Sequence, residues 1–458
     1  RLHAARRPRR RCAAQRGRAS ARQGSQSLPP ARFPERTPAR AMLKSMMRRT
    51  AVVRAIITSE TLIVNWADGH TSRFHHRWLR DHCPQSLHPT SGQRELPLEA
   101  LSAKVKPERI FFGQTGTGGQ TLEVLWPGES EATLAPHKST FCATWLRDKC
   151  YSQEERHRRA AAKTSRRSEL LALAQIDAPL PACIPYEKIN ADKQNPAGPQ
   201  PYVLACLQQL EERGFCRISG VPASVDATRE LASQLGIIQE TFYGRMWDTG
   251  GAGEDDKEQA DAMTDTAYSS VTLPLHTDGT YLEHQPGLQL FNCTAQPPAT
   301  ASEPLAGATR LADGYAVAAL LRSEAPAAFE FFCRAPLPFQ HVAGDVHVSA
   351  TRPVFTLDRV SGDVVEFCYN ETDRAPLDTL SFDDVAAFYE HEGALRRAIG
   401  RLERSVRLQP SEAIVVDNRR VMHGRFGFSG KRHLIGCYLT ADDWRSRLRV
   451  LRRRAAGE

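Results

Sequence analysis

Short strand-like segments separated by turn residues dominate the chain beyond residue 186 and restrict the folds that it can adopt. These runs are rich in β-branched and aromatic residues: FCRIS, GLQLFNC, RPVFTLD, VVEFCYN, AIVVDN and HLIGCYL. The turn Ser361-Gly362-Asp363 separates two of them. Many short strands with few helices favour a sandwich or jelly roll over a parallel α/β sheet. We therefore expect a mainly β domain with flanking helices over residues 186–450.

Two helical patterns and two loops interrupt these strands. Val203, Leu207 and Leu210 recur at helical spacing, and a second helical pattern covers residues 383–403. The segments 249–263 and 296–308 lack core-forming residues and are expected to be surface loops.

The pattern of residues 51–150 predicts a small β-rich unit with an internal repeat. One strand pattern ends at Trp66 and is followed by WLRDHC, and a second ends at Trp126 and is followed by WLRDKC. This repetition predicts two hairpin-like halves that share one core. The charged and Pro-rich segment 151–185 is expected to be a linker or an exposed helix.

The positive charge of the chain is confined to its first 50 residues. They hold 14 Arg and Lys44 against the single acid Glu35, a balance of +14, whereas the whole chain carries +9 and the remainder therefore −5. We therefore infer no nucleic-acid partner. The sequence contains no run of about 18 apolar residues, so we expect no membrane span. The basic segment has the composition of a mitochondrial transit peptide.

A transit peptide is not the only interpretation of this basic segment. The chain opens with Arg1 and its first methionine is Met42, so a disordered tail or sequence upstream of the translation start fits equally well, and a cytoplasmic location is the alternative. The 11 cysteines include no CxxC pair, which fits reduced thiols better than a disulfide framework.

The motif His276-Thr277-Asp278 is the main candidate for chemistry. In a strand, residues i and i+2 point to the same face, so this imidazole and this carboxylate can hold one metal ion together with the later His423. Two histidines and one carboxylate with open positions are the ligand set of non-haem iron(II) oxygenases, whereas zinc prefers a closed shell. Arg432, nine residues after His423, suits the distal carboxylate of a 2-oxo acid.

Several longer stretches carry a more specific signal: WADGHTSRFHHRWLRDHC, QETFYGRMW, DTAYSSVTLPLHTDGTY, QPGLQLFNC, CYNETDRAPL, DNRRVMHGR and GCYLTADDW. Over residues 60–450 the chain resembles the carnitine-biosynthesis dioxygenases, a family of TauD-like 2-oxoglutarate-dependent oxygenases that act on trimethyllysine or γ-butyrobetaine. The resemblance implies a double-stranded β-helix (jelly-roll) domain behind a small N-terminal domain. It also implies iron(II) at His276, Asp278 and His423, 2-oxoglutarate at Arg432, O2 as co-substrate and ascorbate as an added reductant.

The resemblance further implies a trimethylammonium substrate. A quaternary ammonium donates no hydrogen bond and is held by aromatic faces, and Tyr243, Trp247 and Tyr268 match the aromatic cage of the family. Tyr243 and Trp247 would share one side if their turn is helical. Asp265 would suit the α-ammonium of trimethyllysine, which makes hydroxylation to the 3-hydroxy derivative our first expectation. The alternative is hydroxylation of γ-butyrobetaine, because the C-terminal segment RSRLRVLRRR resembles the butyrobetaine enzymes more than the trimethyllysine enzymes.

The chain departs from the family at three places. Cys83 and His137 match ligands of a zinc site in the small domain, but Gln85 and His88 occupy the other ligand positions. Cys83, His88 and His137 are all competent zinc ligands, so a zinc site here stays an open hypothesis. Arg419 replaces the usual Trp before His423, and the usual glycine-rich segment appears only as AGATR. A non-catalytic methylammonium-binding module is a further hypothesis, which the intact metal motif disfavours. A homodimer is kept as a hypothesis for the assembly.

Overall fold

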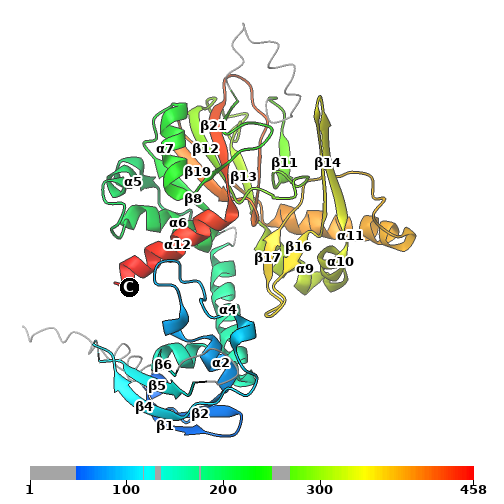
Figure 1. Cartoon of the computed structure of the whole chain (residues 1–458). Helices are drawn as coiled ribbons and strands as arrows, with labels where there is room; N and C mark the ends of the chain where they lie inside the picture. Colours follow the sequence, from blue (N-terminus) through cyan, green and yellow to red (C-terminus); the bar gives the residue numbers. More distant parts are fainter. Residues whose placement is uncertain (1–47, 117, 129–135, 175–176, 250–268, 458) are drawn as a thin grey trace, which may run out of the picture. The chain divides into compact units, whose positions relative to one another are not determined.

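The computed structural model describes residues 48–457 except 117, 129–135, 175–176 and 250–268. The chain divides into two compact units, one up to Glu155 and one from Arg156 (Figure 1). None of the helices among the described residues is long and apolar enough to cross a membrane. The ten cysteines of these residues are free thiols.

The first unit consists of two three-stranded antiparallel sheets. One sheet holds β1 (Val52–Ile57), β2 (Thr61–Trp66) and β3 (Thr71–His75), followed by α2 (His76–Asp81). The other holds β4 (Arg109–Gln114), β5 (Gln120–Trp126) and β6 (His137–Cys142), followed by α3 (Ala143–Asp148). Two 3-10 turns, η1 (Pro84–Ser86) and η2 (Leu98–Ala100), lie between the sheets in sequence.

The two halves of this unit repeat the same polar contact inside one core. The indole N–H of Trp66 donates to Ser72 Oγ, and that of Trp126 donates to Ser139 Oγ, each at 2.8 Å. Both tryptophans belong to one buried cluster with Leu79 from the first half and other residues from both sheets. The duplicated halves with a shared core are therefore confirmed.

The second unit contains a seven-stranded and a four-stranded sheet, with antiparallel pairing except between β7 and β8. The larger sheet holds β7 (Ile184–Pro185), β8 (Phe215–Ser219), β9 (Ile238–Gln239), β10 (Trp247–Asp248), β12 (Leu288–Ala295), β19 (Glu412–Asp417) and β21 (His433–Leu439). The smaller holds β11 (Leu273–His276), β13 (Thr309–Asp313), β18 (Arg404–Val406) and β20 (Val421–Arg425). Two separate two-stranded pairs are β14 (Leu337–Ala343) with β15 (Val346–Arg352), and β16 (Phe355–Leu357) with β17 (Val364–Phe367).

Alternation along the strands gives the larger sheet two buried faces. On β19, Ala413 and Val415 pack in one cluster with helices, whereas Ile414 and Val416 pack in another with Leu311 of β13 and other residues of the smaller sheet. A strand whose two faces are both covered reads as a continuous apolar run, which is why AIVV is so hydrophobic. The two sheets thus share a core, as a sandwich requires.

The helices fall into two groups, one on the other face of the larger sheet and one in a second core. They are α4 (Gln153–Leu173), α5 (Tyr186–Lys193), α6 (Pro201–Arg213), α7 (Val225–Leu235), α9 (Gly314–Glu324), α10 (Pro326–Arg334), α11 (Phe382–Arg401) and α12 (Ala441–Ala456). Helices α5, α6 and α7 pack on the larger sheet, and α12 packs on α6 and α7 (Figure 1). Helices α9 and α10 pack on β17 and β16, and α11 packs on α9 and α10. The expected helices near residues 203–210 and 383–403 are confirmed, and the segment 151–185 contains α4.

The expectation for residues 296–308 is confirmed only in part. The stretch 298–305 is an exposed loop, but Ala306, Gly307 and Ala308 are buried beside the start of β13. Most of the segment 249–263 lies outside the described residues.

A buried ion pair joins three elements around the turn that links β19 to β20. Arg420, whose side chain is only 2% exposed, donates to Asp313 Oδ2 through Nε at 2.9 Å and Nη2 at 2.6 Å. The same guanidinium donates to the Glu211 carbonyl at the end of α6 at 2.7 Å. Asp313 also accepts from the Tyr315 N–H and so caps α9. One pair therefore fixes β13, α6, α9 and the turn before β20 relative to each other.

Replacing Asp313 by asparagine should destabilise the protein strongly. The amide side chain could still cap α9, but the buried guanidinium of Arg420 would lose its counter-charge, which costs about 3–5 kcal/mol. The control is Glu324→Gln in the exposed Arg401–Glu324 pair, where about 1 kcal/mol or less is expected. The measurement is the free energy of unfolding in urea, and equal losses in the two variants would contradict the role of the buried pair.

Candidate metal centre and its cavity

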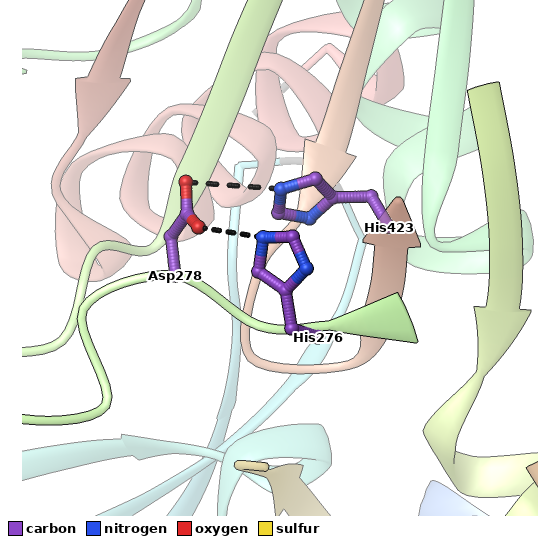
Figure 2. Close-up of side chains that lie close together, drawn as sticks. All are labelled: His276, Asp278 and His423. Atoms are coloured by element: carbon purple, nitrogen blue, oxygen red, sulfur yellow. Dashed lines mark ion pairs between the residues drawn. The ribbon is translucent and has the colours of Figure 1, made fainter. Parts of the chain in front are cut away.

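Two histidines far apart in sequence face each other on neighbouring strands. Strand β11 pairs antiparallel with β20, and His276 is the direct partner of His423 in that register. Directly opposed side chains have Cβ atoms about 4.5–5.5 Å apart, and the two imidazole centroids lie 4.6 Å apart. Strand pairing alone thus brings the two rings together (Figure 2).

Asp278 reaches these rings from a turn, not from a strand as expected. Strand β11 ends at His276, and Asp278 lies in the turn that follows. Gly279 has a φ of +66°, and a Cβ there would come within 2.8 Å of Pro286 Cδ. The turn therefore needs glycine at this position, and it returns the carboxylate toward His276.

The three side chains form a compact group of metal-ligand atoms. Asp278 Oδ1 lies 3.1 Å from His276 Nε2, and Asp278 Oδ2 lies 3.7 Å from His423 Nε2 (Figure 2). All three ligand atoms lie within 4.8 Å of one another. His276 Nδ1 is 2.7 Å from the Pro274 carbonyl, so its N–H donates there and Nε2 is left to bind a metal ion. Two nitrogens and one oxygen can hold a divalent metal from one side.

Hydrogen bonds from neighbouring elements orient Asp278. Its Oδ2 accepts from Gln289 Nε2 at 2.5 Å and from the Tyr438 hydroxyl at 2.8 Å. Its backbone N–H donates to Asn418 Oδ1 at 2.8 Å, and its carbonyl accepts from Asn418 Nδ2 at 2.9 Å. Such outer partners fix a ligand carboxylate before a metal arrives.

The three ligands differ in how readily they give up a proton. Burial lowers the pKa of His423 to about 4, so its imidazole is neutral at pH 7. Burial opposes a charged His276, but the hydrogen bond and negative charge of Asp278 raise the pKa of that imidazole above 6.5. Burial also opposes ionisation of Asp278, yet the neighbouring imidazoles and the Tyr438 hydroxyl hold its pKa well below the usual value. His276 is therefore the ligand at which protons compete with a metal near neutral pH.

Arg432 is a half-buried cation that lines the same cavity. It immediately precedes β21, and its Nε donates to the Gly307 carbonyl at 3.0 Å. Burial and the positive charge of Arg425 lower the pKa of Arg432 to about 10, so it is still charged at pH 7. Among the described residues, none of the ion pairs includes Arg432. A half-buried guanidinium in this position suits an anionic ligand.

Tyr243 and Trp247 both line this cavity, but not through a helical turn. Tyr243 lies in a turn closed by a bridge between Thr241 and Gly244, and Trp247 begins β10. The expected helical spacing is therefore wrong. Trp247 pairs with Gly436 of β21, where any Cβ would come within 2.2 Å of the indole Cη2. The glycine leaves room for this ring on the sheet.

Two further residues were predicted to bind the substrate, Tyr268 in the cage and Asp265 at the α-ammonium. Asp265 and Tyr268 lie outside the described residues. Their roles stay predictions.

The candidate zinc ligands Cys83, His88 and His137 of the first unit are only partly together. Cys83 Sγ lies 3.1 Å from His137 Nε2, and Gln85 Oε1 is 3.4 Å from the same sulfur. His88 is exposed, and its Nδ1 accepts from the backbone N–H groups of Thr90 and Ser91. Among the described residues, the one group of three metal-ligand side chains is that of His276. The structure thus does not support a zinc site of Cys83, His88 and His137.

Several residues of the cavity were not among those predicted from the sequence. Tyr438 and Gln289 contact Asp278, and their strands offered a usable signal, because each is a polar group on the inner face of an apolar strand. The other residues that line the cavity are Thr249, Leu273, Pro274, Tyr281, Phe291, Thr309, Asn370, Thr372, Asp373, Gly424, Arg425 and Leu434.

Arg419, which departs from the family pattern, stabilises the turn before β20. It donates to the Gln285 carbonyl at 2.7 Å and to Glu366 at 2.8 Å.

Comparison with known proteins gives matches over most of the chain. The model of the family described as taurine catabolism dioxygenase TauD, TfdA family matches residues 177–438. A second model, gamma-butyrobetaine hydroxylase-like, N-terminal, matches residues 53–116.

Individual relatives carry two kinds of name. Trimethyllysine dioxygenase of Meyerozyma guilliermondii is 29% identical over 87% of this chain and 96% of its own. The mitochondrial trimethyllysine dioxygenase of Bos taurus is 29% identical over 83% of each chain. Gamma-butyrobetaine dioxygenase of a Pseudomonas species is 30% identical over 85% of this chain and 93% of its own.

Metal affinity should fall as the pH falls, because His276 must lose its proton to bind. Since the pKa of His276 is raised, the loss begins above pH 6.5 and approaches about tenfold per pH unit below that pKa. The measurement is calorimetric titration of the metal-free protein with Mn²⁺ from about pH 8 to about pH 6. His423→Ala serves as a control that should abolish binding. An affinity that is unchanged across this range would contradict the assignment of His276 as a ligand.

Proposed function

The chain belongs to the TauD, TfdA family of dioxygenases, and we propose that it is an iron(II)- and 2-oxoglutarate-dependent enzyme that hydroxylates trimethyllysine at carbon 3. The observation that carries the proposal is one cavity that joins three kinds of group. These are the donor atoms of His276, Asp278 and His423, the half-buried cation Arg432, and the aromatic rings of Tyr243, Trp247 and Tyr438.

The residues present fit iron(II) and a 2-oxo acid. His276, Asp278 and His423 would hold the metal on one side and leave its other positions open, as non-haem iron oxygenases require. Arg432 would bind the distal carboxylate of 2-oxoglutarate through its Nη atoms, since its Nε already donates to Gly307. When bound, iron(II) with 2-oxoglutarate and O2 supplies the oxidising power to hydroxylate an unactivated C–H bond.

The protein's own side chains then orient the reactants. Gln289 and Tyr438 fix the direction of the Asp278 carboxylate, and Asn418 fixes its backbone. The rings of Trp247 and Tyr438 lie 6.5 Å apart at an angle of 55°, and Tyr243 lines the same space. Aromatic faces attract a cation that donates no hydrogen bond, so we propose that these rings hold the trimethylammonium group beside the metal. Tyr268 would complete this cage, and Asp265 would bind the α-ammonium of trimethyllysine at the opposite end of the pocket.

The choice of trimethyllysine rests on the relatives. A fungal and a bovine protein named trimethyllysine dioxygenase match 87% and 83% of this chain. The second candidate is γ-butyrobetaine, because the Pseudomonas relative of that name is 30% identical. Both substrates would place the enzyme in carnitine biosynthesis.

Other features follow from the same proposal. We assign the two facing sheets of the second unit to a double-stranded β-helix, and we assign residues 51–150 to a small N-terminal domain. O2 is the proposed co-substrate and ascorbate an added reductant. The bovine relative is named as mitochondrial, and we propose the same location for this chain.

The purified protein with iron(II), 2-oxoglutarate and ascorbate should convert trimethyllysine to its 3-hydroxy derivative, with one succinate formed per product. The measurement is mass spectrometry of the product together with succinate. A matched compound with carbon in place of the quaternary nitrogen keeps the shape and loses the charge. It should bind at least about fivefold more weakly, since a desolvated cation–π contact contributes about 1 kcal/mol or more. Preferential turnover of γ-butyrobetaine would establish the second candidate, and turnover of neither substrate would refute the proposal.

Replacing Arg432 by methionine should raise the KM for 2-oxoglutarate by about tenfold or more, because the variant loses a charge-assisted hydrogen bond of about 1.5–3 kcal/mol. The substitution keeps an unbranched side chain, and the metal ligands are untouched. The measurement is succinate formation against 2-oxoglutarate concentration, with Mn²⁺ affinity as the control. An unchanged KM would assign the anion site to another cation.

A further inference from the structure

The two carboxylate oxygens of Asp278 have different surroundings. Oδ1 lies 3.1 Å from His276 Nε2, on the side where a metal ion would bind (Figure 2). Oδ2 accepts two hydrogen bonds, one from Gln289 Nε2 at 2.5 Å and one from the Tyr438 hydroxyl at 2.8 Å. In the described part of the chain, neither of these donors bonds to Oδ1 as well. The carboxylate is therefore held asymmetrically.

Strand register brings the two donors to the same oxygen. Gln289 on β12 and Tyr438 on β21 are direct partners in the antiparallel pairing of these strands. Directly opposed residues have Cβ atoms about 4.5–5.5 Å apart on one face of a sheet, and both of these side chains are buried. A carboxylate only accepts hydrogen bonds, so the amide of Gln289 must present its nitrogen to Asp278. The contact is thus built into the sheet.

These two hydrogen bonds occupy the acceptor capacity of Oδ2. An ionised carboxylate has about four acceptor positions, or about two on each oxygen. Gln289 and Tyr438 fill those of Oδ2, whereas Oδ1 keeps capacity for a metal ion. A metal that bound both oxygens would have to displace two buried donors, and buried donors without partners are costly. The structure therefore favours a bond through Oδ1 alone.

We propose that Gln289 and Tyr438 restrict Asp278 to one oxygen on the metal and so keep a position open for O2. An octahedral ion offers about six positions, of which His276, His423 and Oδ1 would take about three. A 2-oxo acid that chelates through its keto and carboxylate oxygens would take about two more and leave about one. A second bond from Asp278 would fill that position. The inference rests on the proposed function and adds two positioning residues to it.

The test counts water ligands on bound Mn²⁺, which needs no turnover. The proteins are wild type, the double variant Gln289→Met/Tyr438→Phe, and the control Tyr186→Phe. Methionine and phenylalanine remove the two donors and keep an unbranched side chain and the aromatic ring. Tyr186 on α5 also bonds to a carboxylate, Glu230 Oε2 at 3.4 Å, but lies outside the cavity. Solvent proton relaxation gives the number of waters before and after 2-oxoglutarate is added, and calorimetry gives the Mn²⁺ affinity.

Wild type and Tyr186→Phe should show about three water ligands without 2-oxoglutarate and about one with it. The double variant should show about two and then about none. Its Mn²⁺ affinity should not fall, because Oδ2 replaces a water as ligand. Its rate of succinate formation should fall by about 10–100-fold. Tyr438→Phe alone should give intermediate water numbers, and it serves as the test if melting temperatures show that the double variant does not fold.

Three results would overturn the inference. Unchanged water numbers in the double variant would mean that Asp278 needs no restraint. Unchanged water numbers together with a loss of Mn²⁺ affinity of about 10–100-fold would mean that the two residues only support the ligand. About two waters on wild type without 2-oxoglutarate would mean that both oxygens bind despite the hydrogen bonds. Failure of wild type to hydroxylate trimethyllysine is a separate result, because it refutes the proposed function and leaves the water count to decide the inference.

Discussion

The arrangement of the second unit depends on the hydrogen bonds of one turn, Asp417–Arg420. Asn418 is fully buried, and its amide bonds to the backbone of Asp278 on both sides, through its oxygen at 2.8 Å and its nitrogen at 2.9 Å. Arg420 joins the same turn to Asp313 and to the end of α6. Because a buried amide or guanidinium left without partners is costly, these contacts permit little variation in the turn. The turn thereby fixes the strand of His423 relative to the turn of Asp278.

Strand pairing also positions the metal ligands. His276 and His423 lie opposite each other on β11 and β20, and β20 also pairs with β13. The alternation that buries Ile414 and Val416 between the sheets directs Gln289 and Tyr438 toward Asp278 from the larger sheet. The metal ligands therefore come from the smaller sheet and its turn, and the groups that orient them come from the larger one. The packing between the two sheets consequently also determines the geometry of the metal ligands.

Much of this could be predicted from sequence because local patterns determine it. The apolar run AIVV identifies a strand covered on both faces, and the spacing of Val203, Leu207 and Leu210 identifies α6. The HxD motif identifies two donors whichever local backbone carries them, so the grouping was expected although Asp278 lies in a turn. The prediction that Tyr243 and Trp247 share a helical turn was wrong because a tertiary contact determines the position of Trp247. Gly436, on a strand distant in sequence, leaves room for the indole. Asp373 and Tyr438 were missed for the same reason, since only the folded chain places them beside the metal turn.

The charges of the cavity explain why an anionic co-substrate and a cationic substrate can share it. Arg425 and Arg432 are close enough that the first lowers the pKa of the second, so the cavity without an anion contains like charges in a buried place. A dicarboxylate bound at Arg432 would relieve this repulsion, and its own charge would then favour a cation nearby. The rings of Trp247 and Tyr438 are suited to a cation without N–H donors. Trimethyllysine and γ-butyrobetaine both carry such a cation, so the rings fit the class of substrate, and the relatives favour trimethyllysine within that class.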